Sequence, residues 1–232
     1  MALQELSRDR YELNLVQIAV TGPPKEDILY AVFTEFVLSH KVPSSRFVLY
    51  PQVDLKWKPE DDDDQRSEVP DFGIGHFTLT GAFKLRCGVE AKRAIGLMAN
   101  LPAPRELINN REVRMAFRLI RFQAEDQAKA AYKNKCPLRE DGIDWILLVG
   151  PYWTPQKFGP FTEAEISVRA MKLSDSGDYG ETMKVMAAME KPYKLRELYT
   201  LNSVESVRRL GSIFGSTDQV AQPYINAMSR GK

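Results

Sequence analysis

The spacing of apolar residues predicts a helix near the start of the chain. Between Lys25 and about His40, apolar side chains recur every three to four residues, at positions 28, 29, 32, 33 and 36. Taking about 100° per residue, they fall on one face, as in an amphipathic helix. Pro23, Pro24 and Pro43 flank the segment, and proline is typical of helix boundaries.

Strands are predicted next. The segment from Arg46 to Lys58 is rich in β-forming residues, and its second half alternates between apolar and charged positions, which is typical of a half-buried strand. Residues 59–69 are polar and acidic, which predicts a loop. Two further strands are predicted over Phe72 to Thr80 and Lys84 to Ala91, with Gly81 near the turn between them.

Another helix and a buried strand follow. Pro102 and Pro104 precede a long helix predicted over about Arg105 to Lys135. The run from Ile143 to Val149 is almost continuously apolar, which indicates a strand buried on both faces. Beyond Pro151 the pattern is weaker, and it predicts a strand over Ala164–Leu173 and helices over Tyr179–Met189 and Val204–Phe214.

This order of elements favours a single α/β domain with a mixed central sheet flanked by helices. The prediction assigns the whole chain, residues 1–232, to that domain, with a core over about 25–150 and a C-terminal extension over about 151–232.

Composition narrows the chemistry. The chain has two cysteines and two histidines, too few for a disulfide framework, a four-cysteine zinc site or most histidine-based centres. Its 32 basic and 31 acidic side chains give a net charge of +1, which provides no global attraction to nucleic acid. Carboxylates, lysines and polar side chains must therefore carry any chemistry.

The apolar pattern also bears on location. No stretch approaches the roughly 18 uninterrupted apolar residues of a membrane span. The first ten residues are polar and mixed in charge, unlike a secretory signal. The chain is predicted to act inside the cell, in the cytoplasm or nucleus, without membrane contact and without secretion.

Two carboxylates and a lysine are predicted to converge on one end of the sheet. Asp71 opens one strand of the predicted hairpin and Glu90 closes the other, so pairing of the strands brings them close. Strand alternation places Glu90 and Lys92 on the same face. Two hard oxygen ligands can hold Mg²⁺ or Mn²⁺, and a lysine beside the metal can orient the attacking water or stabilise developing charge.

The residues Pro70-Asp71 followed by Glu90-Ala91-Lys92 resemble the PD-(D/E)xK pattern of the restriction-endonuclease-like nuclease superfamily. The order of helix, strands, long helix and strand over about residues 25–150 is also similar. The resemblance implies a restriction-endonuclease-like fold and a nuclease that hydrolyses phosphodiester bonds, of DNA rather than RNA, by attack of metal-activated water. It leaves a homodimer open as one form of assembly.

The resemblance also implies roles for single residues. Asp71 and Glu90 would hold the metal, and Lys92 would position or activate the water. An acid from the preceding helix often joins the ligands, and Glu35 is the candidate, although a solvated boundary residue explains it equally well. A glutamine on the following helix is common in the superfamily, which points to Gln127 or Gln123.

Helical angles favour Gln127 over Gln123, because Gln127 lies nearer the middle of the apolar face, where a polar cleft would satisfy its amide. The spacing from Gln127 to Tyr132 is one residue too long for the motif of RecB-type exonucleases.

The same helix carries a basic stripe on its opposite side. Residues 84–139 hold 13 Lys or Arg against 5 Asp or Glu, an excess of 8. Such a face could follow a phosphate backbone, or it could be an ordinary solvated face supported by acidic neighbours. The stripe comprises Arg111, Arg114, Arg118, Arg121 and Lys129.

Two alternatives remain open. The first is a non-catalytic module on the same scaffold that binds nucleic acid or protein, which the near-neutral charge and the irregular glutamine spacing favour. The second is an unrelated fold in which the three charged residues are hairpin surface. Asp61–Asp64 is interpreted as a solvated loop, and Tyr152 and Trp153 as core or turn residues in preference to base-stacking ones.

Overall fold

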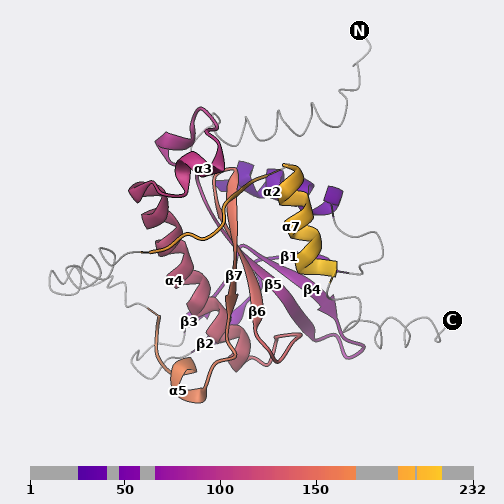
Figure 1. Cartoon of the computed structure of the whole chain (residues 1–232). Helices are drawn as coiled ribbons and strands as arrows, with labels where there is room; N and C mark the ends of the chain where they lie inside the picture. Colours follow the sequence, from indigo (N-terminus) through magenta and orange to yellow (C-terminus); the bar gives the residue numbers. More distant parts are fainter. Residues whose placement is uncertain (1–25, 41–46, 58–65, 171–192, 202, 216–232) are drawn as a thin grey trace, which may run out of the picture.

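Six strands hydrogen-bond into one open sheet in the order β1-β4-β5-β6-β7-β8 (Figure 1). The computed structural model describes residues 26–40, 47–57, 66–170, 193–201 and 203–215. Neighbouring strands are antiparallel except for β5 and β6, which are parallel, so the α/β class with a mixed sheet is confirmed. The strands are β1 (Val48–Pro51), β4 (Phe72–Phe77), β5 (Phe83–Lys92), β6 (Ile143–Val149), β7 (Tyr152–Phe158) and β8 (Tyr199–Thr200).

The predicted hairpin is confirmed as β4 and β5. Gly81 lies in the turn with φ of +82°, a left-handed conformation that glycine adopts without steric cost. Phe72 pairs with Val89, so β5 continues for three residues beyond the paired end of β4. A register shift at Ile74 and Gly75 leaves Arg86 as the extra residue of a β-bulge.

The long predicted helix is two helices, α3 (Pro104–Leu107) and α4 (Arg111–Lys133). Asn110 separates them, with ψ of 133° and a side chain that accepts hydrogen bonds from the backbone N–H groups of Glu112 and Val113. The sequence pattern missed this break because Asn110 acts as an N-cap in the middle of a helical spacing. A short 3₁₀ helix, η1 (Gly96–Met98), precedes α3.

Helices cover both faces of the sheet (Figure 1). On one face lies α4, and on the other lie α2 (Glu26–His40) and α7 (Val204–Gly215). The strand β6 contributes to both cores, which confirms the prediction of a strand buried on both faces. The α4-side core includes Val113, Phe117, Ile120, Trp145 and Leu147, and the α2-side core includes Leu29, Phe33, Val89, Ile146 and Leu148.

The segment predicted as one strand over 46–58 forms two strands. Gln52, with φ of 50°, separates β1 from β2 (Leu55–Trp57), which pairs with β3 (Arg66–Glu68) in a small second sheet. The predicted alternation is confirmed, since Leu55 and Trp57 are buried and Lys56 is exposed. The loop predicted over 59–69 was wrong at its end, where β3 forms; Asp61–Asp64 lies outside the described residues.

The described part of the C-terminal extension completes the sheet with β7 and β8. A strand over Ala164–Leu173 is wrong: a capping box between Thr162 and Glu165 starts the short helix α5 (Glu163–Ile166) instead. The helix over Val204–Phe214 is confirmed as α7, and Tyr179–Met189 lies outside the described residues.

The aromatic pair after β6 belongs to the core. Tyr152 and Trp153 are fully buried, and the Trp153 indole donates to Ser206 Oγ at 2.7 Å, so core packing is confirmed for both. None of the helices in the described ranges is long and apolar enough to cross a membrane.

Gly88 of β5 makes a testable packing contact. A Cβ at this position would lie 2.3 Å from the Trp145 ring, so Gly88→Ala is expected to lower the free energy of unfolding by about 1–3 kcal/mol through overpacking. Urea denaturation measures this, and Trp145→Phe in the same chain is expected to restore part of the loss. Gly96→Ala is the control, because nothing in the described structure lies within 4 Å of its added Cβ. Equal stabilities for the Gly88 and Gly96 variants would contradict the contact.

Candidate functional site

The hairpin brings Asp71 next to Glu90 at one end of the sheet. Asp71 immediately precedes β4, and its Oδ2 accepts a hydrogen bond from the backbone N–H of Ala91 at 2.6 Å. Its Oδ1 accepts a hydrogen bond from the Tyr30 hydroxyl on α2. A strand pairing and a helix contact therefore fix the orientation of the Asp71 carboxylate.

Glu90 is a buried carboxylate with two side-chain partners. Its side chain is 1% exposed. Glu90 Oε1 accepts from Lys92 Nζ at 3.0 Å, and Glu90 Oε2 accepts from Gln127 Nε2 at 2.7 Å. Lys92 is 40% exposed, so its ammonium connects the buried carboxylate with the surface.

Burial and, second to it, the negative charge of Asp71 raise the pKa of Glu90 from its ordinary 4.5 to about 7. The Lys92 ammonium and the Gln127 amide oppose this effect, and burial outweighs them. Near neutral pH, Glu90 therefore exists in both its protonated and its ionised form. A metal cation bound beside the two carboxylates, in addition to the Lys92 ammonium, would favour the ionised form.

Gln127 lies on the inner face of α4 and reaches Glu90, whereas Gln123 is exposed. The Gln127 amide also donates to the Val69 carbonyl at 3.3 Å. Its buried Oε1 has no hydrogen-bond partner among the described residues. The structure thus joins the glutamine favoured by the helical angles to the carboxylate pair.

Glu35 is the acid predicted to join these ligands from the preceding helix. It is half-buried on α2, and the α2 side chain that reaches Asp71 is Tyr30. Across the part of the chain that the structure describes, no three His, Cys, Asp or Glu side chains are grouped so that they could hold a metal ion. A three-carboxylate site of Glu35, Asp71 and Glu90 is therefore not formed.

A cleft of about 460 Å³ adjoins Lys92. Its wall combines apolar side chains of α4 with charged groups, among them Lys92, Arg93 and Asp126. The cleft gives a ligand access to the exposed side of Lys92.

Sequence reasoning missed Asp126 as a member of this cleft. Burial raises the pKa of Asp126 from its ordinary 3.8 to about 7, although its Oδ1 accepts a hydrogen bond from the Ala170 N–H at 2.6 Å. The helical pattern could not predict this, because Ala170, which contacts Asp126, lies 44 residues further along the chain.

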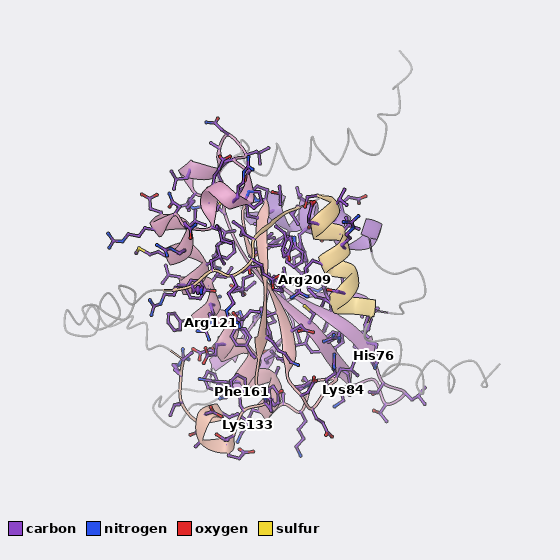
Figure 2. The ribbon with its side chains drawn as sticks, in the orientation of Figure 1. His76, Lys84, Arg121, Lys133, Phe161 and Arg209 are labelled. Carbon is purple, nitrogen blue, oxygen red and sulfur yellow. The ribbon has the colours of Figure 1, made fainter. Side chains whose placement is uncertain are left out.

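The predicted basic stripe of α4 is not uniformly solvated. Lys129 is buried and donates to the Val168 carbonyl at 3.0 Å, so its place on a solvated stripe was wrong. Arg121 pairs with Glu125 at 3.3 Å, which agrees with the ordinary interpretation of a face supported by acidic neighbours. Figure 2 places Arg121 on the α4 side of the sheet and Arg209 on the α7 side.

Comparison with protein-family models, with curated proteins and with solved structures gives no match to this chain.

Proposed function

We propose that this protein is a Mg²⁺- or Mn²⁺-dependent nuclease that hydrolyses phosphodiester bonds of nucleic acid inside the cell, DNA rather than RNA. One observation carries the proposal. The carboxylates of Asp71 and Glu90 lie together at one end of the sheet, with Lys92 bonded to the buried member of the pair.

The arrangement of elements supports a restriction-endonuclease-like fold. A helix, α2, precedes three antiparallel strands, β1, β4 and β5, and α4 then leads to β6, which is parallel to β5. This is the order that the PD-(D/E)xK resemblance implies, and the two motif halves fall where β4 begins and where β5 ends.

The donor set fits a hard divalent cation. Asp71 and Glu90 would hold it, since carboxylate oxygens are preferred ligands of Mg²⁺ and Mn²⁺. Their mutual repulsion would be relieved by a cation. A bound cation of this kind supplies Lewis-acid chemistry, by lowering the pKa of water and neutralising charge on a phosphodiester.

The other residues have distinct tasks in this proposal. Gln127 holds Glu90 in one orientation through the 2.7 Å hydrogen bond. Lys92, at the border between Glu90 and the cleft, orients the attacking water or stabilises negative charge on the phosphate. The Tyr30 hydroxyl fixes Asp71 from the other side of the sheet.

Titration with Mn²⁺ in the absence of substrate tests the metal site. Mn²⁺ is expected to raise the melting temperature of the wild-type protein, with a gain of about 2.7 kcal/mol when its concentration is 100 times Kd. Glu90→Gln and Asp71→Asn are expected to lose most of this gain, because each removes one anionic ligand. Calorimetric titration gives the Kd independently.

Glu35→Gln is the matched control, since it also neutralises a half-buried carboxylate that the structure leaves outside the group. It is expected to retain the Mn²⁺ response. Equal Mn²⁺ responses in the Glu90→Gln, Glu35→Gln and wild-type proteins would place the metal elsewhere. No cleavage of single- or double-stranded DNA or RNA with either metal would reject the nuclease.

A non-catalytic nucleic-acid- or protein-binding module is the second candidate. The observation that favours it is that all four oxygens of Asp71 and Glu90 already accept hydrogen bonds from protein groups. Binding of an oligonucleotide without Mn²⁺ stabilisation and without cleavage would support this module over the nuclease.

A further inference from the structure

A second cavity, of about 580 Å³, lies at the β7 edge of the sheet. Its wall is formed by residues 154–157 of β7, residues 193–197 and the α7 residues Arg209, Ser212 and Ile213, together with Arg86, Arg139 and Asp144. None of Asp71, Glu90, Lys92 or Gln127 lines it. We refer to this cavity as the basic pocket. It is separate from the carboxylate site and independent of the function proposed for that site.

Basic side chains dominate the wall of the basic pocket. Two acidic side chains, Asp144 and Glu197, face six basic ones. The basic residues are Arg86, Arg139, Lys157, Lys194, Arg196 and Arg209.

Both acidic residues of the wall already have partners. Arg86, whose side chain is 2% exposed, pairs with Asp144 and donates to the Ile213 carbonyl at 2.7 Å. Arg209 pairs with Glu197 at 2.9 Å. These contacts hold two guanidinium groups in the wall: Arg86 is held from β6 and α7, and Arg209 is held by Glu197 and, at 3.1 Å, by Ser212 Oγ of its own helix.

The other four basic side chains of the wall outnumber the carboxylates that pair with them. Arg139 and Lys157 share one carboxylate, Asp141, at 3.0 Å and 2.8 Å. Lys194 and Arg196 are exposed and form no ion pair with any residue of the described ranges. Six cations thus face three carboxylates, which leaves an excess of three positive charges around one concavity. A concave wall of one sign concentrates the potential and attracts anions.

The charge and size of the basic pocket define its ligand. The volume lies within the roughly 300–1,000 Å³ of small-molecule sites. Guanidinium groups donate in a planar fork that matches phosphate oxygens, and lysine adds point charge. An excess of three positive charges matches the charge of a group with several ionised phosphates better than that of one carboxylate or one sulfate.

We propose that the basic pocket binds a small ligand that carries a polyphosphate group, such as a nucleoside triphosphate or an inorganic polyphosphate. Arg86 and Arg209 form the rigid part of the site, and Lys194 and Arg196 supply the uncompensated charge at its rim.

Calorimetric titration of the full chain with inorganic tripolyphosphate tests the proposal. EDTA in the buffer removes any contribution of a divalent cation, so failure here is distinct from failure of the metal site. Tripolyphosphate is expected to bind and to raise the melting temperature, and sulfate at the same ionic strength is expected to do neither. ATP titrated in the same way distinguishes the two sources: tighter binding of ATP than of tripolyphosphate supports a nucleoside ligand, and equal binding supports the phosphate group alone.

The variant Lys194→Gln/Arg196→Gln is expected to weaken tripolyphosphate binding by about tenfold or more, since it removes two charge-assisted donors. Arg208→Gln is the matched control: Arg208 is exposed on α7 beside Arg209 and does not line the pocket. Ser212→Ala serves as a second variant if the double variant fails to fold. Absence of tripolyphosphate binding, binding no stronger than that of sulfate, or equal losses in the pocket variant and in Arg208→Gln would overturn the proposal.

Discussion

Lys92→Ala is expected to reduce metal-dependent cleavage of DNA by about 10²–10⁴-fold, the range associated with loss of a positioned general acid, base or charge stabiliser. Lys92 is the member of the group that contacts both the buried Glu90 carboxylate and the cleft. Single-turnover cleavage at saturating Mn²⁺ measures the rate of the chemical step.

The same substitution is expected to leave the fold intact at pH 7. Loss of the Lys92 charge raises the pKa of Glu90 further, so the buried Glu90 becomes neutral and is not left as an unpaired charge. Lys133→Ala, in the exposed last turn of α4, is the control for removal of a lysine, and Lys92→Arg tests whether charge alone suffices. Cleavage by Lys92→Ala at the wild-type rate would contradict the proposed role.

The second large effect concerns Asp126 and the dependence of stability on pH. The unfolded chain releases this proton near pH 3.8, whereas the folded protein retains it up to a pKa of about 7. Between these values the folded state binds more protons, so the free energy of unfolding falls as pH rises, by up to about 4 kcal/mol. Asp126→Asn never ionises and is expected to flatten this decline and to be the more stable protein at pH 8.

Urea denaturation from pH 4 to 8 measures the effect. The asparagine keeps an Oδ1 acceptor for the Ala170 N–H, so Asp126→Asn isolates the charge, and Asp126→Ala removes the hydrogen bond as well. The raised pKa of Glu90 also makes the free energy of unfolding fall as pH rises. The slope in Asp126→Asn is therefore expected to be reduced and not abolished. Asp141→Asn is a control that is expected to leave the slope between pH 4 and 8 unchanged, because the hydrogen bond from Lys157 lowers the pKa of Asp141 below its ordinary 3.8 and its contribution is lost only at lower pH. Parallel pH profiles for the wild-type and Asp126→Asn proteins would contradict the prediction.

Local patterns were sufficient to predict the centre of the candidate site. Asp71, Glu90 and Lys92 belong to one hairpin, so strand alternation and a turn glycine determine which side chains meet. Gln127 was also predictable, because a polar residue on an apolar helix face needs a polar partner, and Glu90 is that partner. Such rules work when the partners are close in sequence or when one face of an element is already defined.

Residues outside those rules could not be found from the sequence. Tyr30 is an aromatic residue of an amphipathic helix, and its hydroxyl contact with Asp71 depends on how α2 packs against the sheet. The wall of the basic pocket is formed by residues between Arg86 and Ile213 that are far apart in the sequence, and only the folded sheet edge brings them together. The break at Asn110 was missed because capping depends on backbone angles that a hydrophobic period does not encode.

The contact between Asp71 and the backbone of Ala91 gives the protein an internal spectroscopic reporter. In most of the sheet, an amide hydrogen of β5 faces a neutral carbonyl, but the Ala91 N–H donates to a carboxylate oxygen at 2.6 Å. The chemical shifts of an amide in this position depend on the charge of the Asp71 carboxylate. The nitrogen and proton resonances of Ala91 are therefore expected to shift when Mn²⁺-free protein is titrated with Mg²⁺, if the proposed metal site at Asp71 binds it, before any substrate is cleaved.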